Sequence, residues 1–214
     1  MSALFRDRRD AGRQLAERLA GYKGQRPLVL AIPRGGVPVG CEIARRLQAP
    51  LDLIIPRKLP IPYNPEAGFG AVTADGTVVL NDEMARSLGL SPEEIESIAM
   101  AVRDEVQRRE RLYRQGPPPD PAGRTVIVTD DGLATGYTMI AAVRMIKKGR
   151  PRKVIVAVPV SPRSSVERLQ READEVVCLH EQTCGPFAVA SFYDSFPDLS
   201  DGEVLAYLGN CPLS

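Results

Sequence analysis

Short apolar runs alternate with amphipathic segments along most of the chain. Each run predicts a buried strand of five or six residues, and the runs cover residues 28–32, 51–55, 125–129, 153–158 and 175–179. Apolar residues at helical spacing predict helices between these strands, at 37–47, 139–148 and 162–171. The order strand–helix–strand indicates parallel neighbours joined by right-handed crossovers. The pattern therefore predicts a doubly wound α/β domain with a mostly parallel sheet.

A further group of elements is inserted between the second and third predicted strands. Residues 57–70 are rich in Pro, Gly and Asn and predict a long loop, which in a compact domain is typical of a lid. Asp75-Gly76 lies between two apolar runs and predicts the turn of a β-hairpin. A capping box and a first-turn proline open a predicted helix over 91–113. A proline-rich stiff connector follows at 116–121.

Two elaborations are predicted near the ends of the chain. Apolar residues at helical spacing predict an amphipathic helix over 3–22. An aromatic-rich loop at 187–197 precedes a short helix over 199–208. We expect a single domain over 1–214, in which the first helix and the inserted helix are candidate contacts of a homodimer.

Composition narrows the classes of function. The 214 residues are 43% apolar and fit one large domain with a full core. A net charge of +1 favours neither nucleic acid nor an anionic membrane, and the arginine-rich stretches at 6–13 and 108–114 are interspersed with acids, so we expect them on solvated helix faces. No apolar run reaches the roughly 18 residues of a membrane span, and the charged N-terminus lacks an apolar signal core, so we expect a cytoplasmic protein.

The cysteines and the single histidine give little sign of metal chemistry. The four cysteines form no metal-type doublet, so each is expected to be a small buried hydrophobe. His180 lies near Cys178 and Cys184, but a zinc site needs a fourth ligand. We therefore expect His180 to be a polar residue at a strand end.

The third predicted strand ends in two adjacent carboxylates, Asp130 and Asp131, followed by a loop of small and hydroxyl residues. In an α/β protein, ligands bind where the carboxyl end of a strand faces a helix N-terminus. Free N–H groups and the helix dipole there favour a phosphate, and Gly136 leaves room for a close approach. Thr135 and Thr138 add hydroxyl donors, while the carboxylates accept from sugar hydroxyls or a hydrated divalent cation. The pattern predicts a phosphorylated sugar; the alternative is a buried strand, an Asp-Gly turn and an N-capped helix.

This segment resembles the phosphoribosyl pyrophosphate (PRPP) signature of type I phosphoribosyltransferases, in which apolar positions, two acids and a small-residue loop follow one another. In that family the acid pair holds the ribose 2- and 3-hydroxyls and the loop holds the 5-phosphate. The resemblance implies that Asp130 and Asp131 are the catalytic acid pair on the ribose. It implies a 5-phosphate loop made of Ala134, Thr135, Gly136, Tyr137 and Thr138.

A second glycine-containing turn follows the first predicted strand, where Gly35 and Gly36 let the chain turn sharply and Arg34 adds a cation. In type I phosphoribosyltransferases, the family that this chain resembles, the corresponding loop binds pyrophosphate, often through a non-proline cis peptide. Arg57 and Lys58, at the start of the predicted lid, are implied to reach pyrophosphate oxygens while the lid excludes water. The structural alternatives are an ordinary tight turn and a solvated connector.

The aromatic-rich loop falls where the family places a hood over the nucleobase. The resemblance implies that Phe192 or Tyr193 stacks on the base and that Asp194 helps to hold Mg²⁺ on the pyrophosphate; the alternative is an aromatic cluster covering the core. Family members that use hypoxanthine or guanine place an Asp in the phosphate loop, near N7 of the base. Ala134 stands there in this chain, which disfavours a substrate that uses that proton relay.

The resemblance implies a pentosyl-transferring glycosyltransferase of nucleotide metabolism. It would transfer the 5-phosphoribosyl group of PRPP to a nitrogenous base or amine and release pyrophosphate, with Mg²⁺ as cofactor. One rival is a non-catalytic regulator that senses PRPP or a nucleotide on the same fold. Another is a Mg²⁺-dependent phosphohydrolase, which would need a third carboxylate or a histidine that is not evident near the acid pair.

Overall fold

A five-stranded parallel sheet forms the centre of the larger lobe. The computed structural model describes residues 3–114 and 116–211. Its strand order is β2-β1-β6-β7-β8, and every neighbouring pair is parallel, as predicted. The strands are β1 (Leu28–Ala31), β2 (Leu51–Leu53), β6 (Thr125–Thr129), β7 (Lys153–Pro162) and β8 (Glu175–Gln182).

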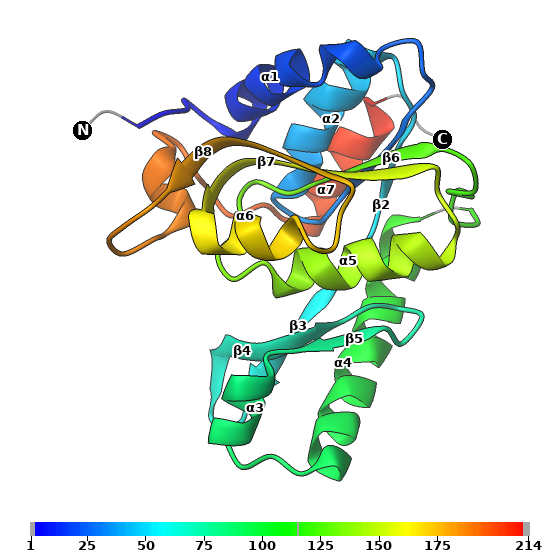
Figure 1. Ribbon diagram of the computed structural model, residues 1–214. Coiled ribbons are helices and arrows are strands. Elements are labelled where there is room, and N and C mark those ends of the chain that lie inside the picture. The colour runs from blue at the N-terminus through cyan, green and yellow to red at the C-terminus, as the bar shows by residue number, and fades with distance from the viewer. Residues whose placement is uncertain (1–2, 115, 212–214) are drawn as a thin grey trace.

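Helices cover both faces of this sheet (Figure 1). On one face lie α1 (Arg8–Arg18), α2 (Gly36–Leu47) and α7 (Asp201–Gly209), and on the other α5 (Tyr137–Lys148) and α6 (Arg163–Leu169). Side chains alternate across each strand, so β1 and β6 supply both cores. Val29 and Ile127 pack with α2, whereas Leu28 and Val126 pack with α5. Burial on both faces explains the uninterrupted apolar runs of the sequence.

A smaller lobe is inserted between β2 and β6 (Figure 1). Its antiparallel sheet has the order β3-β4-β5 and carries two helices. The elements are β3 (Arg57–Ile61), β4 (Asn64–Val72), β5 (Val78–Leu80), α3 (Asp82–Ser87) and α4 (Pro92–Tyr113). Leu59 and Phe69, both fully buried, pack against the inner face of α4 at Ala99 and Val102. The lobe thus has its own small hydrophobic core.

The predicted lid over 57–70 is wrong, because this segment forms the hairpin of β3 and β4. Pro60 concealed the strand, since proline weakens a strand assignment. In the structure it sits where the register shifts on both sides, which is where a sheet tolerates proline. The turn places Tyr63 at φ 69° with its side chain fully exposed. The hairpin predicted at Asp75-Gly76 is confirmed by the antiparallel pairing of β4 with β5.

Local capping fixes where the helices begin. The capping box predicted at Ser91 and Glu94 is present, with both hydrogen bonds formed. The N-terminal helix is shorter than predicted, because the Asp7 side chain accepts the Asp10 N–H at 2.7 Å and starts α1 at Arg8. The short helix α3 was not predicted, although Asn81 caps it. A polar window of six residues carries too little periodicity to predict a helix.

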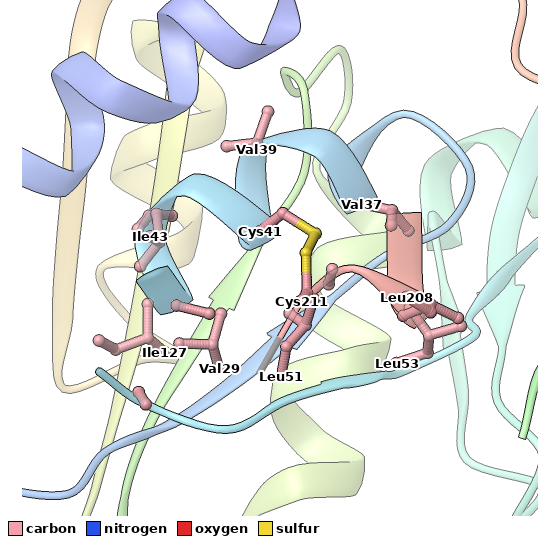
Figure 2. Packing of buried hydrophobic residues seen from close by; sticks show 14 of the residues in the cluster. Val29, Val37, Val39, Cys41, Ile43, Leu51, Leu53, Ile127, Leu208 and Cys211 are labelled. Carbon is pink, nitrogen blue, oxygen red and sulfur yellow. A yellow bond between two sulfur atoms is a disulfide. The ribbon is translucent and has the colours of Figure 1, made fainter. Parts of the chain in front are cut away.

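Two of the four cysteines form a disulfide, which corrects the expectation that all four are separate hydrophobes. Cys41 of α2 is bonded to Cys211, just after α7, at a sequence separation of 170. Figure 2 shows the bond inside the core between α2 and the sheet, next to Leu51 and Leu208. Cys178 and Cys184 are free. None of the helices in the described ranges has the length and apolarity needed to cross a membrane.

The disulfide should contribute substantially to stability, because it restricts a long stretch of the unfolded chain. We expect Cys211→Ser to lower the free energy of unfolding by about 2–4 kcal/mol in the absence of reductant. Urea denaturation measures this, and reduction of the wild type should produce a similar loss. Cys184→Ser, at an exposed free cysteine, is the control. Equal midpoints for Cys211→Ser and the oxidised wild type would contradict the expectation.

Candidate active site

The candidate site lies where the loops after β1 and β6 meet. These strands are adjacent and parallel, with Ala31 opposite Thr129, so their carboxyl ends share one edge of the sheet. Ile32 N–H donates to Thr129 O at 2.9 Å and continues the pairing beyond the strands. The segment Pro33–Gly36 and the segment Asp130–Gly136 are therefore side by side, as ligand sites in open α/β sheets require.

The two glycines after β1 allow this close approach. A Cβ on Gly35 would lie 1.9 Å from Oδ2 of Asp131, and a Cβ on Gly36 would lie 2.9 Å from Cα of Asp130. Neither glycine has a positive φ, so the close approach and not the backbone conformation requires glycine here. The peptide between Pro33 and Arg34 is cis, as is common in the corresponding loop of the resembled family.

The two carboxylates of the acid pair have different surroundings. Asp130 lines the cavity in front of the sheet, and its Oδ1 accepts the Asp131 N–H at 2.8 Å. Asp131 forms an ion pair with Arg8, in which Nε lies 2.7 Å from Oδ2, and its carbonyl accepts the Tyr193 hydroxyl at 2.5 Å. Only Asp130 therefore lines the cavity directly.

The acid pair is electrostatically unfavourable as it stands. Burial and the neighbouring Asp131 raise the pKa of Asp130 well above the ordinary value for an aspartate. Burial also raises the pKa of Asp131, and the Arg8 guanidinium opposes that shift. A ligand that donates hydrogen bonds to the pair would relieve this cost.

Side chains from α6 hold the backbone of the predicted phosphate loop, and the amide groups at the start of α5 are left without helical acceptors. Ser165 Oγ donates to Ala134 O at 2.8 Å, and Arg168 donates to Thr135 O at 2.5 Å. Gly136 has φ 80° and directs the chain into α5, whose first helical hydrogen bond runs from Ile140 to Gly136. The N–H groups of the first turn therefore have no helical acceptor and are available to an anion.

A cavity of about 490 Å³ opens between the two lobes in front of these loops. Basic side chains dominate its charged lining: Arg34, Arg57, Lys58 and Arg109, with Glu105 and Asp130. Arg57 pairs with Glu105 at 2.7 Å, and Arg34 lies 3.9 Å from Asp201. Burial, followed by the charge of Arg109, lowers the pKa of Arg57.

Arg109 supplies the clearest sign of an absent ligand. Its Nε atom is buried and has no hydrogen-bond partner in the described part of the chain, and the nearest counter-charge is Oε1 of Glu105 at 3.7 Å. A buried donor without an acceptor is costly. An anion in the cavity would satisfy this donor and neutralise the repulsion between Arg57 and Arg109.

The structure brings together five of the predicted site residues around this cavity: Arg34, Arg57, Lys58, Asp130 and Thr138. It does not bring the aromatic loop there. Phe192 and Tyr193 are only 9% and 6% exposed, inside a cluster with Phe5. Neither ring presents an open face to the cavity, so this arrangement matches the predicted alternative of a core-covering cluster.

Asp194, the predicted magnesium ligand, is exposed and does not line the cavity. Its N–H donates to Phe5 O at 2.9 Å. Within residues 3–114 and 116–211, no group of three or more His, Cys, Asp or Glu side chains is arranged to hold a metal ion. The expected role of Asp194 therefore has no support from its position.

Two arginines of the site, Arg8 and Arg109, were expected on solvated faces. Arg109 instead shares the buried stripe of α4 with Val102, Val106 and Tyr113. These positions recur every three or four residues, so the helical period itself placed Arg109 on the inner face. Arg8 likewise continues the buried stripe of α1 and is only 8% exposed.

Comparison with known proteins agrees with this geometry. The sequence profile of the phosphoribosyl transferase domain matches residues 73–191. "Putative phosphoribosyl transferase Rv0571c" of Mycobacterium tuberculosis H37Rv is 45% identical over 206 residues, which cover 96% of this chain and 46% of that protein. The chain thus spans about half the length of this relative and of its counterpart in strain CDC 1551. A uracil phosphoribosyltransferase of Acinetobacter baylyi is 33% identical over 89 residues, 42% of each chain.

Solved structures show the same fold. The crystal structure of TT1426 from Thermus thermophilus has a TM-score of 0.79 and 42% identity, covering 97% of this chain and 98% of that one. AQ2163 from Aquifex aeolicus, at 14% identity and a TM-score of 0.52 over 81% and 74% of the chains, shares the fold alone. The chain belongs to the phosphoribosyl transferase domain family. The predicted family and fold, that of a type I phosphoribosyltransferase, are confirmed.

The contact of Gly35 with Asp131 is open to a direct test. We expect Gly35→Ala to push the Asp131 carboxylate off Arg8 and to lower the free energy of unfolding by about 1–3 kcal/mol, the usual cost of overpacking. Urea denaturation measures the change. Gly21→Ala is the matched control, because nothing lies within 4 Å of a Cβ at that position. Equal losses in the two variants would argue against the contact.

The ionised form of Asp130 should lower the free energy of unfolding. A carboxyl whose pKa is raised on folding binds its proton more tightly in the folded state, so its ionised form destabilises the fold above that pKa and not in acid. We therefore expect Asp130→Asn to be at least as stable as wild type at pH 8, with the gain shrinking as the pH falls. Thermal unfolding across pH measures this. A variant less stable than wild type at pH 8 would contradict it.

Proposed function

We propose that this protein transfers the 5-phosphoribosyl group of PRPP to a nitrogenous base or amine and releases pyrophosphate. One observation carries the proposal: the buried Nε of Arg109 has an ion-pair contact with Glu105 but no hydrogen-bond acceptor among the described residues, and it lies in a cavity with Arg34, Arg57 and Lys58. A diphosphate has the charge and the acceptors that this lining lacks. The same cavity borders Asp130 and the first turn of α5, which would take the sugar and its phosphate.

Different residues of the site would bind different parts of PRPP. The acid pair accepts from the ribose hydroxyls and lies close to C1, where positive charge develops as the bond to pyrophosphate breaks. The loop from Ala134 to Thr138 holds the 5-phosphate through backbone N–H groups and the hydroxyls of Thr135 and Thr138. Arg34 and Arg109 bind the leaving pyrophosphate and stabilise its charge. Each such electrostatic contact is worth roughly 2–4 kcal/mol in the transition state.

Mg²⁺ enters this proposal as part of the substrate. The described residues build no resident metal site, and Mg²⁺ commonly binds through substrate phosphates with few protein ligands. A complex of Mg²⁺ with PRPP fits the cavity, because it still leaves anionic oxygens for the arginines. When bound, the ion neutralises the leaving pyrophosphate.

Both lobes would act as one functional domain, since the larger lobe contributes Arg34 and Asp130 to the cavity and the smaller lobe contributes Arg57 and Arg109.

The proposed activity is tested by incubating the purified protein with PRPP, Mg²⁺ and a panel of bases and amines and measuring the release of pyrophosphate. Uracil belongs in the panel because of the named relative. We expect no pyrophosphate release with hypoxanthine or guanine if these bases require a carboxyl group at the position of Ala134. The proposal would be contradicted if the protein neither binds PRPP nor releases pyrophosphate with any acceptor.

Arg109 provides the sharpest variant. We expect Arg109→Gln to weaken PRPP binding about 10- to 100-fold, because a charge-assisted hydrogen bond is worth roughly 1.5–3 kcal/mol. Isothermal titration with PRPP and Mg²⁺ measures the affinity. Arg111→Gln is the control, since Arg111 lies on the exposed side of the same helix. Similar affinities for the Arg109 and Arg111 variants would contradict the assignment.

A further inference from the structure

The chain preceding α1 is fastened to the segment after the 3-10 helix at Val189–Phe192. Leu4 and Phe5 N–H both donate to Phe192 O at 3.0 Å, and Asp194 N–H donates back to Phe5 O at 2.9 Å. In Figure 1 the blue N-terminal segment runs beside the orange segment that follows β8. These bonds set the position of Arg8, the first residue of α1.

The Arg8 side chain is held in a single orientation. Its Nε donates to Asp131 Oδ2 at 2.7 Å and its Nη1 donates to Pro197 O at 2.7 Å. The guanidinium carbon lies 3.7 Å from the ring centroid of Phe196, so the plane of the group is covered as well. Only a planar group with several donors can make these three contacts together.

Asp131 is fixed from the other sides too. Tyr193 holds its carbonyl, and the absent Cβ of Gly35 provides the space that the carboxylate occupies. Arg8 takes Oδ2, and the other side-chain neighbour of the Asp131 carboxylate is the carboxyl group of Asp130, which lines the cavity. Arg8 thus holds one oxygen of Asp131, and the other oxygen is the one left for a ligand that displaces Asp130 from the pair.

We propose that Arg8 is a positioning residue for the transfer reaction: it holds Oδ2 of Asp131 so that Oδ1 alone is presented to a ribose hydroxyl of PRPP. The inference rests on the proposed function, since it needs PRPP in the cavity. It gives the N-terminal helix a part in the site: neither Arg8 nor Asp131 lines the cavity itself, and Arg8 acts through Asp131, whose neighbour Asp130 does line it. The competing explanation is a structural ion pair that only holds α1 against the sheet.

A double-mutant cycle separates the two explanations. PRPP affinity, with Mg²⁺ present, is measured by calorimetry for wild type, Arg8→Lys, Asp131→Asn and the double variant. Arg8→Lys keeps the charge but cannot bond Asp131 and Pro197 at once. We expect it to bind PRPP about 10-fold more weakly, and to have no further effect in the Asp131→Asn background, because Arg8 acts only through that carboxylate.

Arg8→Met, which removes the charge, should weaken binding further than Arg8→Lys, so that the conservative variant is a partial rescue. If Arg8→Met does not fold, the cycle with lysine still decides. Arg9→Met is the control, because Arg9 pairs with Glu42 on the exposed side of α1. Wild-type affinity in Arg8→Lys, or losses that multiply in the double variant, would overturn the inference. A wild type that does not bind PRPP would instead overturn the proposed function.

Discussion

The site depends on the packing of two glycines against two aspartates. Gly35 and Gly36 bring the loop after β1 against Asp130 and Asp131 at distances that no side chain would permit. Because β1 and β6 are neighbours in the parallel sheet, the contact joins an anion-binding loop to an acid pair without any intervening element. The two motifs lie about a hundred residues apart in sequence and act as one unit only through this contact.

The arrangement of charge in the site destabilises the free protein. On one side, two half-buried carboxylates are neighbours; on the other, Arg57 and Arg109 share the single counter-charge of Glu105, and Nε of Arg109 has no hydrogen-bond acceptor among the described residues. A core selected for stability alone would contain neither arrangement. A ligand that carries hydroxyl donors at one end and anionic oxygens at the other satisfies both groups at once, which is the chemistry of a phosphorylated sugar diphosphate.

The sequence predicted the parallel sheet from its aliphatic runs, and it located two acids and a small-residue loop between β6 and α5, because these are local patterns. Of the inserted lobe it predicted the hairpin of β4 with β5 and the helix α4, but it missed β3 and α3, since Pro60 conceals a strand and a six-residue helix has little periodicity. Arg109 was not predicted as a site residue, because its charge favours an exposed position although its spacing places it on the buried stripe of α4. The disulfide pairing depends on the position of α7, which no local pattern fixes.

The backbone around Phe5 has a practical consequence. Residues 4–6 form a continuous hydrogen-bonded seam with residues 192–195, and the next turn of chain carries the guanidinium that grips Asp131. A purification tag or fusion partner joined directly ahead of this seam would pull on the same few bonds. Recombinant versions of the protein therefore call for a flexible spacer at that end, or for the tag to be cleaved before ligand affinity is measured.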